Sequence, residues 1–335
     1  MATYKGINGF AVQSVASDPS PLDEGQVWYN NATYAFKLAS VTTAGTWAAG
    51  GNIGTARYAA GSAGTQTAAL GFGGYGPPLV PTSVLTEEYD GTSWTAGGSL
   101  NTGRYALASA GTQTSALASG GGAVPGGTGL SAVEKYDGTS WTSSTSLPGT
   151  RASSGGAGTQ TAALVFGGIT PPGATLLTSS FEFDGTSWSP GGTLNDNRGR
   201  GISGCGTQTA ALAFGGQGGA PRSAATEEYD GTSWTAGGSL NTARSKMSQN
   251  IGTQTSALAA GGQPGPVNEI NLVEQYNGTS WTSVATLTTA RQAPIGGGDT
   301  SNGLVASGGG AAGYVSATEE WTGPGVATTK TITTS

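Results

Sequence analysis

Residues 89–94 read Tyr-Asp-Gly-Thr-Ser-Trp, and the same six residues recur at 136–141 and 229–234. Versions with one change stand at 183–188 and 276–281, and the tryptophan has a further counterpart near the start of the chain. Successive tryptophans are separated by 47, 47, 47, 46 and 47 residues, at Trp47, Trp94, Trp141, Trp188, Trp234 and Trp281. A period this constant indicates one structural unit repeated six times.

Three further marks share the period. A Gly-Thr-Gln-Thr turn starts at Gly64 and recurs in four later units, and a Gly-Gly pair ends each following apolar run, as at 120–121. An arginine recurs at Arg57, Arg104, Arg151, Arg198, Arg244 and Arg291. Because four independent marks stay in register, the units are expected to be copies of a single fold element.

Each unit is expected to form four short β-strands. In the second unit, residues 104–110 and 115–119 flank the Gly-Thr-Gln-Thr turn, residues 132–136 alternate apolar and charged side chains, and Asp137-Gly138 is a strong hairpin signal. Glycine supplies 61 of the 335 residues, which disfavours helices. Four strands in a repeat of this length predict an all-β protein, a six-bladed β-propeller.

The glycine pair, the Glu-x-Tyr-Asp segment, the tryptophan and the arginine resemble the kelch repeat in order and spacing, over residues 45–322. The resemblance implies a kelch-like propeller with four strands per blade. Kelch propellers include enzymes, adaptors and binding modules, so the resemblance implies a fold and leaves the function open.

The two ends of the chain predict how the ring closes. The sixth unit lacks the expected tryptophan after Trp321, whereas Trp47 stands alone before the first unit. We therefore expect an N-terminal strand with Trp47 to complete the sixth blade, because closure removes exposed sheet edges. The alternative is that residues 322–334 supply this strand. The expected organisation is an anchor segment at 1–44 containing a hairpin at 26–38, a propeller at 45–322 and a tail at 323–335.

The composition limits the function classes. Charged residues make up 10% of the chain and the net charge is −6, which argues against nucleic-acid binding. No apolar run approaches the roughly 20 residues that a membrane span needs, and no signal peptide is visible. Histidine is absent, which excludes Ser-His-Asp and Cys-His catalysis. We predict no cofactor, no metal site, no catalytic residue and no enzymatic activity; Cys205 occupies a slot that holds alanine in other units and is expected to be buried and inert.

The six arginines have two interpretations. They could ring the mouth of the central channel and bind an anion or an acidic sugar. Alternatively, each pairs with a glutamate of the third strand, such as Glu88, Glu182, Glu228 or Glu320. We favour the second interpretation, because a ligand site would be unique and these residues recur in every unit. The repeat arginines and tryptophans are therefore expected to be structural.

The loops between second and third strands differ from unit to unit, at 75–83, 122–129, 169–178, 217–224 and 263–271. Variable loops on a constant scaffold are where recognition usually occurs. The binding candidates are Tyr75, Pro77, Pro78 and Leu79 for apolar contact, and Arg222 and Glu269 for charge. The alternative is neutral drift in loops without a ligand.

The segments outside the repeat carry a second resemblance. Residues 1–6 (Met-Ala-Thr-Tyr-Lys-Gly), 25–30 (Gly-Gln-Val-Trp-Tyr-Asn) and the threonine-rich 327–335 are similar to the ends of structural proteins of marine tailed phages, cyanophages especially. This implies a virion component, assembled in the host cytoplasm.

We therefore predict a non-enzymatic virion protein of the tail, fibre or capsid decoration. Residues 1–44 would bind other virion proteins, and the propeller would bind a host-surface glycan or protein. The alternatives are a carbohydrate-binding module outside any virion and a glycan-active enzyme. The enzyme would need paired carboxylates, of which Glu269 is the clearest candidate on the loop side.

Overall fold

The computed structural model describes residues 12–20, 26–41, 44–76, 82–123, 128–172, 174–218, 221–265, 268–325 and 327–332. The chain divides into two compact units, one comprising Trp47–Trp321 and the other comprising both chain ends. No helix among the described residues is long and apolar enough to cross a membrane.

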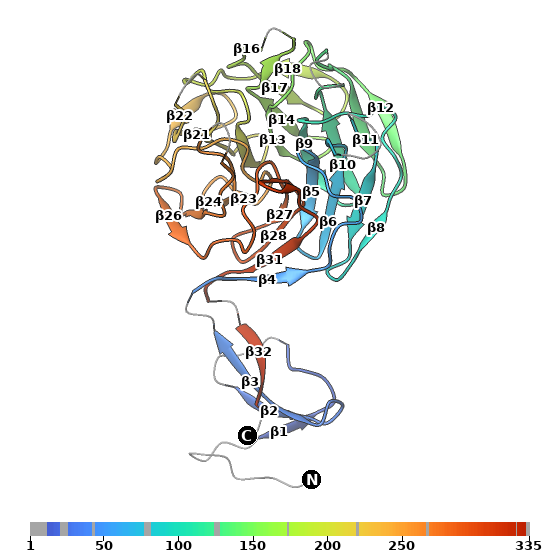
Figure 1. Cartoon of the computed structure of the whole chain (residues 1–335), viewed down its shortest axis with the longest axis vertical. Helices are drawn as coiled ribbons and strands as arrows, with labels where there is room; N and C mark the ends of the chain where they lie inside the picture. The colour runs from blue at the N-terminus through green and yellow to red at the C-terminus, as the bar shows by residue number, and fades with distance from the viewer. Residues whose placement is uncertain are drawn as a thin grey trace. The chain divides into compact units, whose positions relative to one another are not determined.

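The larger unit is a closed ring of six four-stranded antiparallel sheets (Figure 1), which confirms the predicted six-bladed propeller. Blade 1 contains β5 (Gly61–Thr65), β6 (Ala68–Phe72), β7 (Thr86–Tyr89) and β8 (Trp94–Ala96), and blade 2 contains β9 (Ala108–Thr112), β10 (Ser115–Ser119), β11 (Val133–Tyr136) and β12 (Trp141–Ser144). Blade 3 contains β13 (Gly155–Gly158), β14 (Ala163–Phe166), β17 (Ser180–Phe183) and β18 (Trp188–Pro190), and blade 4 contains β19 (Ser203–Gly206), β20 (Ala211–Phe214), β21 (Thr226–Tyr229) and β22 (Trp234–Ala236). Blade 5 contains β23 (Gly252–Thr253), β24 (Ser256–Ala260), β25 (Val273–Tyr276) and β26 (Trp281–Val284), and blade 6 contains β27 (Ile295–Gly298), β28 (Asn302–Ala306), β31 (Thr318–Thr322) and β4 (Thr46–Gly50).

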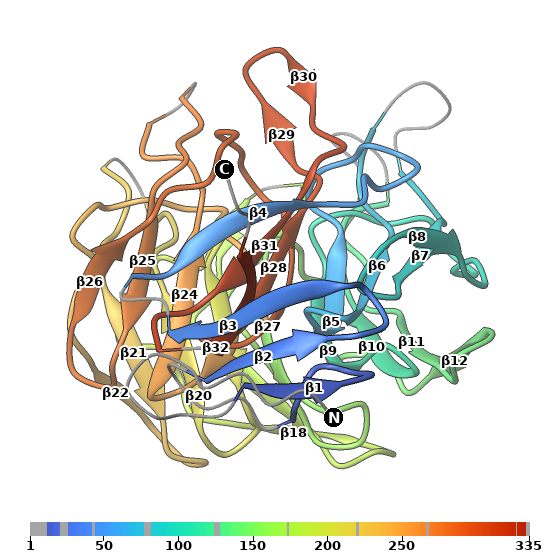
Figure 2. The same cartoon turned by 90° about the horizontal axis from the view of Figure 1, so that it is seen from below.

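The expected closure is confirmed, because β4 carries Trp47 and is the fourth strand of blade 6, beside β31 (Figure 2). The Trp47 indole donates to the Ala285 carbonyl of blade 5 at 2.9 Å, as a repeat tryptophan should. The alternative, in which residues 322–334 complete this blade, is wrong. Two short hairpins extend the loops of blades 3 and 6: β15 (Ile169–Thr170) with β16 (Thr175–Leu176), and β29 (Gly309–Gly310) with β30 (Gly313–Tyr314).

The smaller unit is a four-stranded sheet in the order β1 (Gln13–Val15), β2 (Val27–Asn30), β3 (Ala35–Val41) and β32 (Ala327–Ile332). The predicted hairpin is confirmed by the antiparallel pairing of β2 with β3. Sequence analysis did not predict that the tail would join it, yet β32 pairs with β3 over six residues. Asp18 accepts hydrogen bonds from Lys37, Asn30 and Trp28, and these bonds lower its pKa to about 2.

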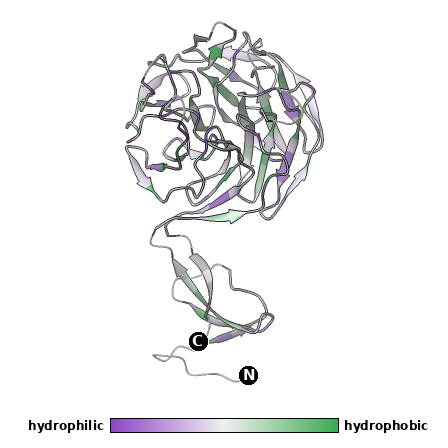
Figure 3. Cartoon of the chain, in the orientation of Figure 1, coloured by the Kyte–Doolittle hydropathy of each residue, from purple (hydrophilic) through white to green (hydrophobic). Residues whose placement is uncertain are grey.

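The core of the propeller lies between blades. Six clusters of buried side chains each combine residues of two neighbouring blades, so the apolar core is itself a closed ring. The second strand of each blade is the most completely buried, and the hydrophobic colouring follows these strands (Figure 3). One repeat tryptophan packs at each interface and donates its indole N–H to the preceding blade, as Trp141 does to Thr86 at 2.9 Å.

The other repeat marks also join neighbouring blades. The Gln113 amide of the Gly-Thr-Gln-Thr turn donates to the Ala69 and Tyr89 carbonyls of blade 1, and equivalent bonds occur at four other interfaces. The Asp137 carboxylate accepts from the main-chain N–H groups of Thr139 and Ser140, which fixes the turn before Trp141. The repeated motifs are therefore accounted for by packing and turn geometry.

Candidate ligand site at the channel mouth

The six repeat arginines are buried, each 2% exposed or less. Five pair with a glutamate on the third strand of their own blade: Arg57–Glu87, Arg104–Glu134, Arg198–Glu227, Arg244–Glu274 and Arg291–Glu319. Burial lowers the pKa of Arg104, and the charge of Glu134 partly offsets this. The guanidinium also donates to the carbonyls of Gly120 and Ala132. Five of the six arginine charges are therefore balanced by glutamates inside the protein, as the structural interpretation predicted.

The expected partners Glu88, Glu228 and Glu320 were wrong by one position, and Glu182 accepts a hydrogen bond from Tyr229 rather than from an arginine. Side chains alternate along a strand, so adjacent glutamates such as Glu87 and Glu88 lie on opposite faces of the sheet. Glu87 accepts from Arg57, whereas Glu88 accepts from the Tyr136 hydroxyl of the next blade. The same hydroxyl–carboxylate contact is made by the pairs Tyr89–Glu320, Tyr229–Glu182 and Tyr276–Glu228.

Blade 3 departs from both pairings. Phe181 stands in the position of Glu87, and its ring lies 4.7 Å from the Arg151 guanidinium carbon. Arg151 donates to Gly167 and Ser179 but pairs with no carboxylate in the described part of the chain, and burial lowers its pKa to about 10. Phe183 replaces the tyrosine of this blade, and Lys135 of blade 2 lies over its ring instead of a glutamate.

The residues that follow each arginine form a collar around the channel. One residue per blade has a left-handed backbone with φ between 46° and 65°, at Ala59, Ala106, Ser153, Gly201, Lys246 and Ala293. Each donates its main-chain N–H to the carbonyl of its counterpart in the preceding blade, at 2.6 to 3.0 Å. Since Ala59 donates to Ala293, the six hydrogen bonds form a closed cycle. Left-handed backbone costs about 1–2 kcal/mol for a non-glycine residue, and the cycle holds five of them there.

Blade 5 closes the channel below this collar. Six positions separate the collar residue Lys246 from Gly252, against five between Ala106 and Gly111 and in every other blade. The extra residue leaves β23 with only two residues. Asn250, with φ of 60°, crosses the channel and donates to Ser62 of blade 1 at 2.8 Å and to the Ser109 hydroxyl of blade 2 at 3.1 Å.

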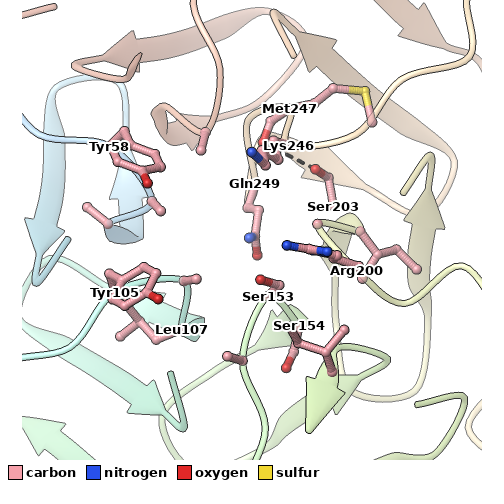
Figure 4. A pocket seen from close by; sticks show the side chains of 18 of the residues that line it. Tyr58, Tyr105, Leu107, Ser153, Ser154, Arg200, Ser203, Lys246, Met247 and Gln249 are labelled. Carbon is pink, nitrogen blue, oxygen red and sulfur yellow. Dashed lines mark hydrogen bonds between the residues drawn. The ribbon is translucent and has the colours of Figure 1, made fainter. Parts of the chain in front are cut away.

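A cavity of about 340 Å³ lies within the collar, above this crossing. Tyr58 and Tyr105 lie on one side, Arg200 and Lys246 lie on the opposite side, and the Gln249 amide lies between them (Figure 4). Leu107, Ile169 and the prolines at 171–172 complete an apolar part of the wall. The volume is at the lower end of the range for small-molecule sites.

The aromatic side is a cluster of four tyrosines from blades 1, 2 and 6. Tyr58 lies 5.5 Å from Tyr75 and 5.8 Å from Tyr314 between ring centroids, and Tyr75 lies 6.0 Å from Tyr105. Burial raises the pKa of Tyr58, and the neighbouring tyrosines raise it further. The rings therefore support one another and present a fixed aromatic surface.

The cationic side is held by a short chain of hydrogen bonds. The Lys246 ammonium donates to the Gln292 amide oxygen at 3.0 Å, and the Gln292 amide nitrogen donates to Glu269 at 2.8 Å. Burial lowers the pKa of Lys246; Arg222 and Arg200 lower it further, whereas Glu269 raises it. Arg222 donates to Gln263 and Gly265 in the neighbouring loop.

The predicted binding residues lie next to this cavity. Tyr75 packs on its aromatic side, and Arg222 and Glu269 support its cationic side, but none of the three is among its lining residues. Pro77, Pro78 and Leu79 lie outside the described residues. Sequence analysis missed Tyr58, Tyr105, Arg200, Lys246 and Gln249. The signal was present, because these residues lie one to five positions after a repeat arginine, in a segment that varies between units.

Side chains that could act as nucleophiles or metal ligands do not form a second site in the part of the chain that the structure describes. Burial raises the pKa of the Cys205 thiol to about 12. Among the described residues, no three His, Cys, Asp or Glu side chains gather as a possible metal site. The cavity wall itself carries no acidic side chain among the residues that the structure describes.

Comparison with known proteins bears on the fold. No protein-family model matches the chain. No curated protein matches it. Among solved structures, the chain is similar to one entitled "Structure of YjhT", with a TM-score of 0.67 and 15% sequence identity, covering 84% of this chain and 99% of the other. At this identity the likeness shows the β-propeller fold alone.

Proposed function

We propose that this protein is a non-enzymatic recognition protein of a phage virion, in which the channel mouth of the propeller binds a component of the host surface. One observation carries the recognition part of the proposal. The collar gives six blades the same backbone, yet its side chains are not constant: the collar residue is alanine in three blades and serine, glycine or lysine in the others, and the residue before it is tyrosine, alanine, arginine, serine or glutamine. A constant frame with varied side chains around a cavity is typical of a binding site.

The division of the chain supports the virion part of the proposal. Both chain ends belong to one unit, with β32 paired to β3, and the propeller is a unit of its own. The end unit carries the segments that resemble phage structural proteins. We infer that the end unit attaches to other virion proteins and that the propeller performs recognition.

The lining chemistry favours binding over hydrolysis. A paired-carboxylate glycosidase needs two carboxyl groups facing the substrate. Glu269 is held by Gln292 behind the cationic side, and the described cavity wall offers no partner for it. A glycan-active enzyme is therefore the weaker alternative, and a binding module outside any virion remains the second candidate, supported by the same cavity.

The test is immunogold labelling of phage particles from the source, with an antibody raised against the propeller. Label at the tail tip would support host adhesion, and label over the capsid would support decoration. Particles that carry no label, although the antibody recognises the pure protein, would contradict the virion assignment and leave the free binding module.

A further inference from the structure

The positive charge at the channel mouth is concentrated in an otherwise acidic protein. The chain has 13 basic residues, of which six are the buried repeat arginines. Three of the other seven, Arg200, Arg222 and Lys246, come together on one side of the mouth, where Arg200 lowers the pKa of Arg222 and both arginines lower the pKa of Lys246. This side is therefore an electropositive patch on a chain whose net charge is −6.

The charge that faces the cavity is not neutralised by a carboxylate. Arg200 is exposed, its guanidinium points into the cavity (Figure 4), and none of the ion pairs among the described residues includes it. Lys246 is separated from Glu269 by the Gln292 amide. A planar guanidinium beside an ammonium is suited to hold a carboxylate, which accepts two parallel hydrogen bonds from arginine.

The opposite wall suits a ring that is apolar on one face. Tyr58 and Tyr105 present aromatic rings and hydroxyl groups, and Tyr75 and Tyr314 hold Tyr58 in place. Aromatic rings pack favourably against the C–H face of a sugar and keep their hydroxyl groups available for hydrogen bonds. An inorganic anion would use the cationic side and leave this wall without a role.

The floor offers hydrogen-bonding capacity that the protein does not use. The Gln249 side-chain oxygen is buried and has no hydrogen-bond partner among the described residues. An unpaired buried acceptor is unfavourable, and a ligand hydroxyl could supply the missing hydrogen bond. Ser153 lies across the cavity from Lys246 and adds a hydroxyl to the wall (Figure 4).

We propose that the cavity binds one carboxylate-bearing sugar, a uronic acid residue of an acidic glycan. Arg200 and Lys246 hold the carboxylate, Tyr58 and Tyr105 stack on the ring, and Gln249 accepts a hydrogen bond from a hydroxyl. The volume of about 340 Å³ suits a single sugar ring and excludes the buried binding of a longer chain. The inference deepens the proposed recognition role and rests on it for the source of the glycan.

The test compares matched sugars on the full chain by NMR titration. Methyl glucuronide and methyl galacturonide are compared with methyl glucoside and methyl galactoside, which differ only in carrying a hydroxymethyl group in place of the carboxylate. At least one uronide should bind at least tenfold more tightly than its neutral partner. Arg200→Gln and Tyr58→Ala should each weaken uronide binding at least tenfold, whereas Lys135→Gln, a cation of blade 2 outside the cavity lining, should leave it unchanged.

Three outcomes would overturn the inference. These are equal binding of a uronide and its neutral partner, failure of both uronides to bind, and displacement of the uronide by inorganic sulfate at equal concentration, which would indicate an anion site without sugar recognition. Thermal unfolding of each variant shows whether a loss of binding reflects a loss of folding. Particle labelling is independent of these results. Labelled virions together with no uronide binding would contradict the assignment of a uronic acid as the ligand and leave the proposed function in place.

Discussion

The blade interfaces and the channel mouth are built from the same six repeats, but different features of the repeat are constant in the two regions. At the interfaces the side chains repeat: each repeat tryptophan donates its indole N–H to the preceding blade, and in five blades a glutamine donates to two carbonyls of the preceding blade. At the mouth the backbone repeats in the collar, and the side chains differ. The difference indicates that sequence identity between repeats marks stabilising contacts, whereas variation beside an unchanged arginine marks the surface that is free to bind.

Breaking a buried arginine–glutamate pair of the repeat should produce the largest effect. Glu134→Gln removes the carboxylate from Arg104, which is fully buried and pairs with no other acidic group among the residues that the structure describes. An uncompensated buried charge costs about 3–5 kcal/mol, so the free energy of unfolding measured in urea should fall by that amount. A loss below about 1 kcal/mol would show that the pair behaves like an exposed one.

Blade 3 sharpens the comparison, because its arginine already lacks a carboxylate. Arg151→Ala removes hydrogen bonds to Gly167 and Ser179 and the contact with Phe181, but it leaves no stranded charge. We expect a loss of about 1–3 kcal/mol. The matched variant Arg104→Ala strands Glu134 and should cost more, about 3–5 kcal/mol. Neither should alter binding at the mouth; equal losses of stability in the two variants would contradict this account.

The tyrosine contacts give the interfaces a pH dependence. Burial and the hydrogen bond to Glu88 raise the pKa of Tyr136 to about 12, and three other tyrosines are shifted to the same value. A pKa raised in the folded state means that this stability is complete below the usual tyrosine pKa of about 10 and is lost as the pH rises towards 12.

Tyr136→Phe should therefore lose about 1–2 kcal/mol at pH 9, because it removes a hydrogen bond to a charged acceptor. It should then lose less stability than the unmodified protein between pH 9 and pH 11. Urea denaturation at the two pH values measures both quantities. Parallel losses in the two proteins would show that Tyr136 does not titrate across the transition.

The repeat marks were enough to predict the number of blades, the strands and the Trp47 closure, because each mark makes a local turn or an interface contact. Which of two adjacent glutamates pairs with the arginine was predicted wrongly. Blade 2 contained the answer, because it has a single glutamate, Glu134, followed by Lys135, and Glu134 stands at the position that faces the arginine. The collar could not be predicted, since its left-handed residues are mostly alanine, serine and lysine. The cavity floor depends on one extra residue in blade 5. The segment that contains it crosses the channel because Asn250 donates hydrogen bonds to Ser62 and Ser109, and such distant contacts cannot be seen in the sequence.

The mouth should show the smallest effect on stability. Arg200 is exposed, and Arg200→Gln removes a charge that no carboxylate of the described cavity wall balances. Its removal also lessens the repulsion that lowers the pKa of Lys246. We expect the free energy of unfolding to change by less than about 0.5 kcal/mol, measured in urea beside Glu134→Gln. A loss comparable to that of Glu134→Gln would mean that Arg200 belongs to the scaffold, and the distinction between repeated interface and varied mouth would then fail at this position.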